Sequence, residues 1–213
     1  MKKLLSLLLT AAMMLTLAAC GTTNADSNTA DEPKNGVTTD AADPAPTEET
    51  PESTGSKVLV AYFSATGHTK AIAEYLQAAL DADLYEIVPQ EPYTADDLDY
   101  NTDGCRANRE QNDDAARPAI SGSVENMAGY DVVFIGYPIW WGQAPKIVYT
   151  FLESDDLSGK TIVPFCTSGG SGIDGSLGGL QALAPDADWL TGQRFSASAS
   201  AADVQSWVDS LGL

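Results

Sequence analysis

Residues 57–76 read Lys57-Val-Leu-Val-Ala-Tyr-Phe-Ser-Ala-Thr-Gly-His-Thr-Lys-Ala-Ile-Ala-Glu-Tyr-Leu76 and contain three successive patterns. Residues 58–63 form an almost unbroken apolar run, which is typical of a strand buried on both faces of a parallel sheet. From Ile72 onward, apolar residues recur at helical spacing. Between these two patterns lies a short turn with several hydroxyl side chains and one glycine. The stretch therefore predicts a strand, a tight turn and a helix of an α/β domain.

The predicted turn has the chemistry of an anion-binding site. The first N–H groups of a helix lack intrahelical acceptors and carry the positive end of the helix dipole. Ser64, Thr66 and Thr69 add hydroxyl donors around Gly67, which has no Cβ to keep a ligand from the backbone. Such a turn suits a phosphomonoester; the alternative is that the hydroxyls only cap the helix. The turn has neither the P-loop lysine nor a Gly-x-Gly-x-x-Gly pattern, which disfavours nucleoside triphosphates and dinucleotides.

The sequence beyond residue 56 alternates strand and helix patterns, which predicts an α/β sheet with helices on both faces. Further elements are expected as strands at 84–89, 131–136, 160–165 and 194–200, and as helices at 124–130, 145–153, around 177–183 and at 202–211.

Residues 90–122 interrupt this alternation, because they are polar and show no sustained apolar period. A connection of this length is usually functional or mobile. It could fold over a ligand site, or it could be a solvated excursion held by its own polar contacts. In the first case its binding side chains would be Tyr93, Tyr100, Asn101, Arg106, Asn108, Arg109 and Arg117.

Three loops should meet at one edge of the predicted sheet, because open α/β sheets bind ligands beyond the carboxyl ends of their strands. The first loop is the turn at 64–69. The second, at 137–142, places two adjacent indoles in a loop bounded by Pro and Gly, where at least one could form a flat apolar wall; the alternative is that both belong to the core. The third, at 166–172, offers small side chains and free backbone amides.

The run from Val58 to Thr69 resembles the first strand and phosphate loop of the flavodoxins, whose pattern is Ser/Thr-x-Thr-Gly-x-Thr. Ser64, Thr66, Gly67 and Thr69 match every position of that pattern. The Pro-x-Trp-Trp-Gly run at 138–142 is similar to a loop of quinone-reductase-type and short flavodoxin-like proteins. The resemblance covers about residues 57–211, more weakly after residue 175, and implies a flavodoxin-like doubly wound parallel sheet of about five strands in the order 2-1-3-4-5.

The resemblance also implies that the chain binds FMN. In the flavodoxins the first loop holds the FMN phosphate, and here that loop comprises Ser64, Ala65, Thr66, Gly67, His68 and Thr69. The flavin rings would contact the other two loops, through Pro138, Ile139, Trp140, Trp141, Gly142, Thr167, Ser168, Gly169, Gly170 and Ser171. FMN itself supplies the redox chemistry, so no catalytic side chain is expected, and His68 is expected to fill the loop.

Three functions fit these features. The protein could be a redox protein that passes electrons to a partner protein or a small acceptor. It could be an FMN-dependent NAD(P)H:quinone-type reductase that uses residues 90–122 as a substrate lid, or a phosphate-ligand binding module without flavin. Two classes of hydrolase are disfavoured. A tyrosine phosphatase would need an Arg six positions after its Cys, and Gly172 stands at that position after Cys166. The Gly-x-Ser-x-Gly elbow of serine hydrolases is absent from the sequence.

The charge of the chain argues against a nucleic-acid partner. The 213 residues carry a net charge of −19, and residues 57–213 hold eight Lys or Arg against 22 Asp or Glu. Such a surface repels phosphate backbones. It suits docking to a basic partner, or it serves only solubility. His68 is the single histidine and no Cys-x-x-Cys occurs, so no metal site is expected.

Residues 1–19 have the pattern of a bacterial lipoprotein signal peptide, with Lys2 and Lys3 before a long apolar run. Leu17-Ala-Ala-Cys20 resembles a lipobox, in which Cys20 is lipidated and becomes the first mature residue. The alternatives are a secretory signal cut near Ala19 or a membrane anchor. The expected location is therefore extracytoplasmic, with the protein held on the cell membrane by the lipid on Cys20.

Residues 20–56 are rich in Thr, Ala, Asp, Glu and Pro and predict a disordered acidic tether. The flavodoxin-like domain is expected to occupy residues 57–213. Cys105 and Cys166 lie within it, and an exported protein tolerates either a disulfide between them or two free thiols.

Overall fold

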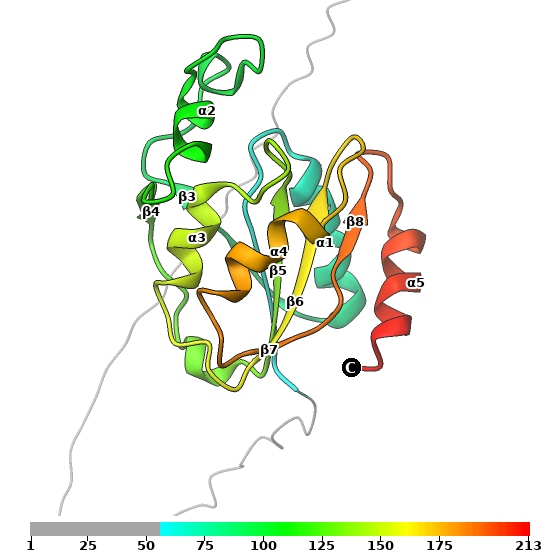
Figure 1. Cartoon of the computed structure of the whole chain (residues 1–213). Coiled ribbons are helices and arrows are strands. Elements are labelled where there is room, and N and C mark those ends of the chain that lie inside the picture. Colours follow the sequence, from blue (N-terminus) through cyan, green and yellow to red (C-terminus); the bar gives the residue numbers. More distant parts are fainter. Residues whose placement is uncertain (1–55) are drawn as a thin grey trace, which may run out of the picture. The chain divides into compact units, whose positions relative to one another are not determined.

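The computed structural model describes residues 56–213 (Figure 1). Outside the described residues lie the predicted signal peptide and residues 20–55 of the predicted tether, which include Cys20. Within the described part, the helices are all too short or too polar to cross a membrane.

The described residues form short strands and helices in regular alternation. In chain order they are β1 (Val58–Tyr62), α1 (His68–Leu80), β2 (Asp83–Glu86), β3 (Val88–Pro89), the 3-10 helix η1 (Asp96–Leu98), α2 (Arg106–Gln111), β4 (Ile120–Ser121), the 3-10 helix η2 (Met127–Gly129), β5 (Val132–Pro138), α3 (Lys146–Leu152), β6 (Thr161–Thr167), α4 (Asp174–Gln181), β7 (Asp188–Trp189), β8 (Gln193–Phe195) and α5 (Ala201–Leu211).

The main sheet is parallel and has the order β2-β1-β5-β6-β7, with β8 also paired to β6. Its central strands β1, β5 and β6 are buried along almost their whole length, as the apolar runs predicted. The predicted doubly wound α/β sheet of about five strands is confirmed. The order reverses between β1 and β5, which places the crevice for a ligand at their carboxyl ends.

The fifth position of the sheet is divided between two short strands. β7 pairs with the start of β6, and β8 pairs with its end. Pro164 lies between these two pairings and has no N–H to donate, so continuous pairing on that side is interrupted. Only the start of the strand predicted at 194–200 is present, because β8 ends at Phe195, and β7 was missed because it has just two residues.

Helices cover both faces of the sheet (Figure 1): α1 and α5 pack together on one face, and α3 and α4 lie on the other. On the first face, Trp207 of α5 packs against Phe134, Phe165 and Phe195. Gly136 makes room for the Phe165 ring, because a Cβ on Gly136 would lie 2.1 Å from the Phe165 Cζ. Gly136 is thus required by packing.

Two further predicted elements differ from the structure. The strand expected at 84–89 is two strands: β2 belongs to the main sheet, whereas β3 turns away to pair antiparallel with β4. The helix expected at 124–130 is wrong. Asn126 adopts a left-handed conformation (φ 56°), which ends any helical run there, and the 3-10 helix η2 alone follows.

Residues 90–119, which connect β3 to β4, are more ordered than their sequence indicated. They contain α2 and η1, and we call them the insertion (Figure 1). Cys105 at the start of α2 and Cys166 in β6 are both buried free thiols.

Candidate functional site

Three loops follow the carboxyl ends of β1, β5 and β6, and direct hydrogen bonds hold them together. The Ile139 N–H donates to the Thr167 carbonyl (3.0 Å), which joins the second loop to the third. The Thr69 and Thr167 hydroxyls lie 2.8 Å apart, which joins the first loop to the third. The structure therefore brings the three predicted loops to one edge of the sheet.

The turn after β1 has the shape of an open anion cradle. Gly67 has a φ of 87° and precedes α1, a conformation that favours glycine. No side chain caps the start of α1; instead, the Ser64 hydroxyl accepts the Gly67 N–H (3.1 Å). The structure therefore does not show the alternative arrangement, in which the hydroxyls only cap the helix. The first N–H groups of α1 remain available to an anion.

Side chains of this turn divide into an exposed and a buried group. Ala65, Thr66 and His68 are exposed, so they face solvent or a ligand. Thr69 is only 1% exposed, and its hydroxyl is already paired with Thr167. Thr69 thus fixes the turn to the neighbouring loop, a role that the motif alone did not reveal.

The second loop contains a tight turn built on two residues with positive φ. The Trp140 N–H and the Gln143 N–H each donate to the other residue's carbonyl at 2.9 Å, and the central residues Trp141 and Gly142 have φ of 46° and 80°. Two positive φ values define a type I′ turn. A left-handed conformation is unfavourable for Trp by about 1–3 kcal/mol, and such strain is typically kept at functional sites.

The two tryptophans have opposite environments. Trp140 is 4% exposed, and Phe63 and Tyr93 each meet its ring in an edge-to-face arrangement at 5.5 and 5.2 Å between centroids. Trp141 is 41% exposed and lies against Tyr100 of the insertion, at 4.4 Å between centroids. Trp140 therefore belongs to the core, and Trp141 is the indole available to a ligand.

The third loop presents open backbone. The Ser168 N–H donates to the Phe195 carbonyl, and the Arg194 guanidinium donates to the Ser168 carbonyl at 3.0 Å. The Ser168 hydroxyl donates to the Ser171 carbonyl within the loop. A Cβ on Gly169 or Gly170 would meet no heavy atom within 4 Å, so a ligand can approach the main chain there.

The insertion packs against the second loop through Tyr93, which the sequence indicated as a candidate binding residue together with Arg106, and through Gln111, which it did not indicate. The Tyr93 hydroxyl donates to Glu110 (2.5 Å), Arg106 donates to the same carboxylate (2.7 Å), and the Arg106 guanidinium lies 4.2 Å from the centre of the Tyr93 ring. Burial and the Glu110 hydrogen bond raise the pKa of Tyr93 well above its ordinary value, so Tyr93 stays a hydroxyl donor. Gln111 was not singled out from the sequence; its amide contacts the Trp140 loop.

Other polar side chains of the insertion stabilise it or join it to the end of α3. Arg117 pairs with Glu153 through two hydrogen bonds of 2.6 and 2.8 Å, and Asn108 accepts the Gly104 N–H. Arg109 donates to the Gly104 carbonyl. These three side chains are therefore occupied by contacts within the protein.

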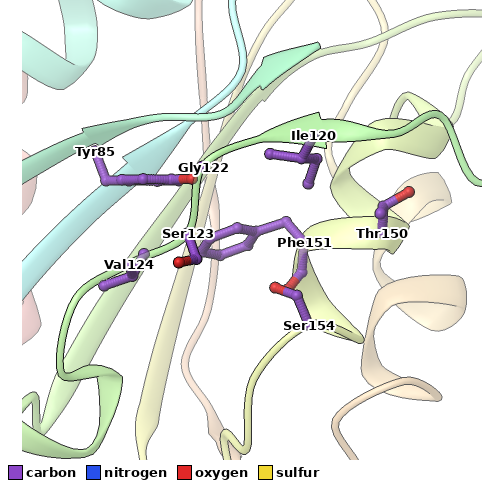
Figure 2. Close-up of a pocket in the computed structure, with 8 residues that line it drawn as sticks. All are labelled: Tyr85, Ile120, Gly122, Ser123, Val124, Thr150, Phe151 and Ser154. Atoms are coloured by element: carbon purple, nitrogen blue, oxygen red, sulfur yellow. The ribbon is translucent and has the colours of Figure 1, made fainter. Parts of the chain in front are cut away.

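A separate pocket of about 200 Å³ lies between β2, β4 and α3 (Figure 2). Figure 2 shows the Tyr85 hydroxyl pointing toward Gly122, with Phe151 below it. The buried Tyr85 oxygen has no hydrogen-bond partner among the described residues. None of the residues that line this pocket belongs to the three loops. Across residues 56–213, no group of three or more His, Cys, Asp or Glu side chains is arranged to bind a metal.

The flavodoxin family model matches residues 57–211, which include all three loops. The chain belongs to the flavodoxin family. A candidate flavoprotein of known structure from Bacteroides eggerthii DSM 20697 is 49% identical, with a TM-score of 0.70; the match covers 75% of this chain and 99% of that one. A second candidate flavoprotein, from Bacteroides uniformis ATCC 8492, is 43% identical with the same TM-score and covers 73% of this chain and 99% of its own.

A more distant solved structure shares the fold. A flavoprotein from Lactobacillus acidophilus NCFM, solved in complex with FMN, is 24% identical with a TM-score of 0.60, and the match covers 75% of this chain and 100% of that one. None of the curated proteins compared matches the chain at a significant level.

Proposed function

We propose that this flavodoxin-family protein binds FMN and transfers electrons, with the phosphate in the 64–69 turn and the flavin rings beside Trp141. The uncapped start of α1 is the observation that carries this proposal, since its N–H groups and the Thr66 side chain can surround a phosphate. Trp141 and the open backbone at Gly169 and Gly170 offer contacts for the ring system. The bound cofactor would supply the redox chemistry.

The first test is the visible absorption spectrum of the purified full-length protein, before and after titration with FMN. A yellow protein, or one that takes up FMN in a saturable manner, is expected. A colourless protein that binds no flavin would contradict the proposal and would leave the phosphate-ligand module as the remaining function.

Thr66→Glu tests the position of the phosphate. Thr66 is exposed, so the substitution should leave the free energy of unfolding unchanged within about 0.5 kcal/mol. The new carboxylate would repel the phosphate, so FMN retention should be lost, whereas riboflavin, which lacks the phosphate, should bind as it does to the wild type. Unchanged FMN content in the purified variant would refute the assignment of this turn.

We propose a basic redox protein or a small electron acceptor as the partner. Five ion pairs engage the cations Lys57, Lys70, Arg106, Arg117 and Lys146. Residues 57–213 nevertheless carry an excess of negative charge, which would attract a basic partner surface and speed association with it at low ionic strength. Catalytic turnover of NAD(P)H with a quinone would instead favour the reductase function, for which the insertion beside Trp141 would form a substrate wall.

A further inference from the structure

The insertion is fixed to the flavin-site edge of the sheet by an internal network. Glu110 of α2 accepts hydrogen bonds from both Tyr93 and Arg106, and Arg106 also donates to the Glu91 carbonyl at 2.9 Å. The Tyr93 ring in turn packs against Phe63, at the end of β1, with 5.7 Å between centroids. α2 is therefore a supported element and not a solvated excursion.

Gln111, at the end of α2, holds both ends of the turn that presents Trp141. Its amide nitrogen donates to the Trp140 carbonyl (3.1 Å) and to the Ala144 carbonyl (3.2 Å). These two carbonyls flank the type I′ turn, so one side chain closes it from outside. The two donated bonds also fix the orientation of the amide, because the reverse orientation would place its oxygen against two carbonyl oxygens. The amide oxygen itself is buried and has no partner among the described residues.

Tyr100 supports the exposed indole from the other side. Its ring lies 4.4 Å from the Trp141 ring between centroids, with 32° between the planes, and it is 56% exposed. Trp141 would lose this contact if the turn changed its conformation. The positive φ of Trp141 is unfavourable by itself, so the turn needs such external support to persist.

We propose that Gln111 is a positioning residue, which together with Tyr100 holds Trp141 in the orientation that contacts the flavin rings. This inference rests on the proposed FMN binding and adds a residue outside the phosphate loop and the Trp loop. It predicts that ring contact, and not phosphate contact, depends on the insertion.

The test compares FMN and riboflavin binding to the full-length wild type and to Gln111→Leu, which removes both donated hydrogen bonds at similar volume. Both dissociation constants should rise by about tenfold, because without these two hydrogen bonds only about one molecule in ten would hold the turn in its binding conformation. Their ratio should stay constant, because the phosphate turn is untouched. Gln205→Leu is the matched control: Gln205 is exposed on the outer side of α5 and bonds only to Asp209, so neither constant should change.

A second readout separates positioning from loss of stability. With the site saturated by FMN, Gln111→Leu should quench flavin fluorescence less than the wild type does, whereas a variant that is only less stable would quench it fully. Equal quenching and equal dissociation constants would overturn the inference, and so would a loss confined to FMN. If Gln111→Leu fails to fold, Tyr100→Leu replaces it, because its exposed side chain can be changed without opening the core. The dissociation constants and the fluorescence quenching of Tyr100→Leu are then judged by the same criteria.

Failure of the proposed function gives a different result, since the wild type itself would then bind neither flavin. Wild-type binding together with unchanged Gln111→Leu and Tyr100→Leu variants would overturn only the role of the insertion.

Discussion

At the scale of single residues, the adjacent tryptophans show that neighbours in sequence can have separate roles. Trp140 fills the space between Phe63 and Tyr93, whereas Trp141 projects from a strained turn toward Tyr100. Burial therefore assigns Trp140 to the core and leaves Trp141 available to a ligand.

The pair Trp140→Ala and Trp141→Ala tests this assignment. Removing the Trp140 ring leaves a core cavity and should lower the free energy of unfolding by about 3–5 kcal/mol, measured by urea denaturation of the flavin-free protein. Trp141→Ala should lower it by no more than about 1 kcal/mol, because the residue is exposed and loses one ring contact. It should nevertheless weaken FMN binding and restore flavin fluorescence. Flavin affinity and quenching equal to those of the wild type would contradict the role of Trp141.

The buried thiol of Cys166 should make the stability of the fold depend on pH. Burial raises its pKa to about 12, so the folded protein keeps the thiol protonated where the unfolded chain would ionise it. Stability should therefore be unaffected by Cys166 below about pH 8.5, the ordinary thiol pKa, and should fall as the pH rises above that value.

Urea denaturation at pH 8, 9 and 10 measures this effect, with Cys166→Ala as the comparison. The variant should lose less stability over this range than the wild type. In the wild type at pH 8, Cys166 should react with a thiol reagent only on unfolding. Equal slopes in the two proteins, or fast modification of Cys166 in the native state, would show that the thiol ionises in the fold.

At the scale of elements, the close approach of β5 and β6 depends on Gly136. This glycine is needed for the space that it leaves and not for a positive φ. Gly136→Ala would place a methyl group against the Phe165 ring and should lower the free energy of unfolding by about 2–3 kcal/mol. In a Phe165→Leu background the same substitution should be less destabilising, because the smaller side chain leaves room for it. Equal losses in both backgrounds, measured by urea denaturation, would rule out this packing explanation.

The sequence predicted the central strands and the 64–69 turn because their signals are local. A buried parallel strand is an apolar run, and the 64–69 turn is defined by its own hydroxyls and Gly67. The roles of Trp140 and Trp141 could not be separated, since they depend on Tyr93 and Tyr100 from a distant segment.

The insertion was not predictable for the same physical reason. α2 has only six residues, which is too short to show an apolar period, and its position depends on the Tyr93–Glu110–Arg106 network. Ion pairs and ring contacts between residues far apart in the sequence leave no periodic pattern. The separation of β3 from β2 was missed because both lie within one short apolar run.

At the scale of the whole molecule, we propose that a lipid on Cys20 holds the protein at the outer face of the cell membrane. Radiolabelled fatty acid fed to producing cells should label the wild type and should fail to label Cys20→Ala. A matched Cys105→Ala variant should remain labelled. Absence of label in the wild type, or label that persists in Cys20→Ala, would refute this location.

The attachment of Ser168 to β8 has a consequence for the order in which the molecule matures. The third loop receives its support from Arg194 and Phe195, which lie close to the carboxyl terminus. A nascent chain still held on the ribosome before these residues emerge has the 64–69 turn but lacks the two contacts that hold Ser168. Under the proposed FMN binding, cofactor capture is therefore expected after synthesis is nearly complete, and a carboxy-terminal truncation that removes β8 should yield a chain that does not retain FMN.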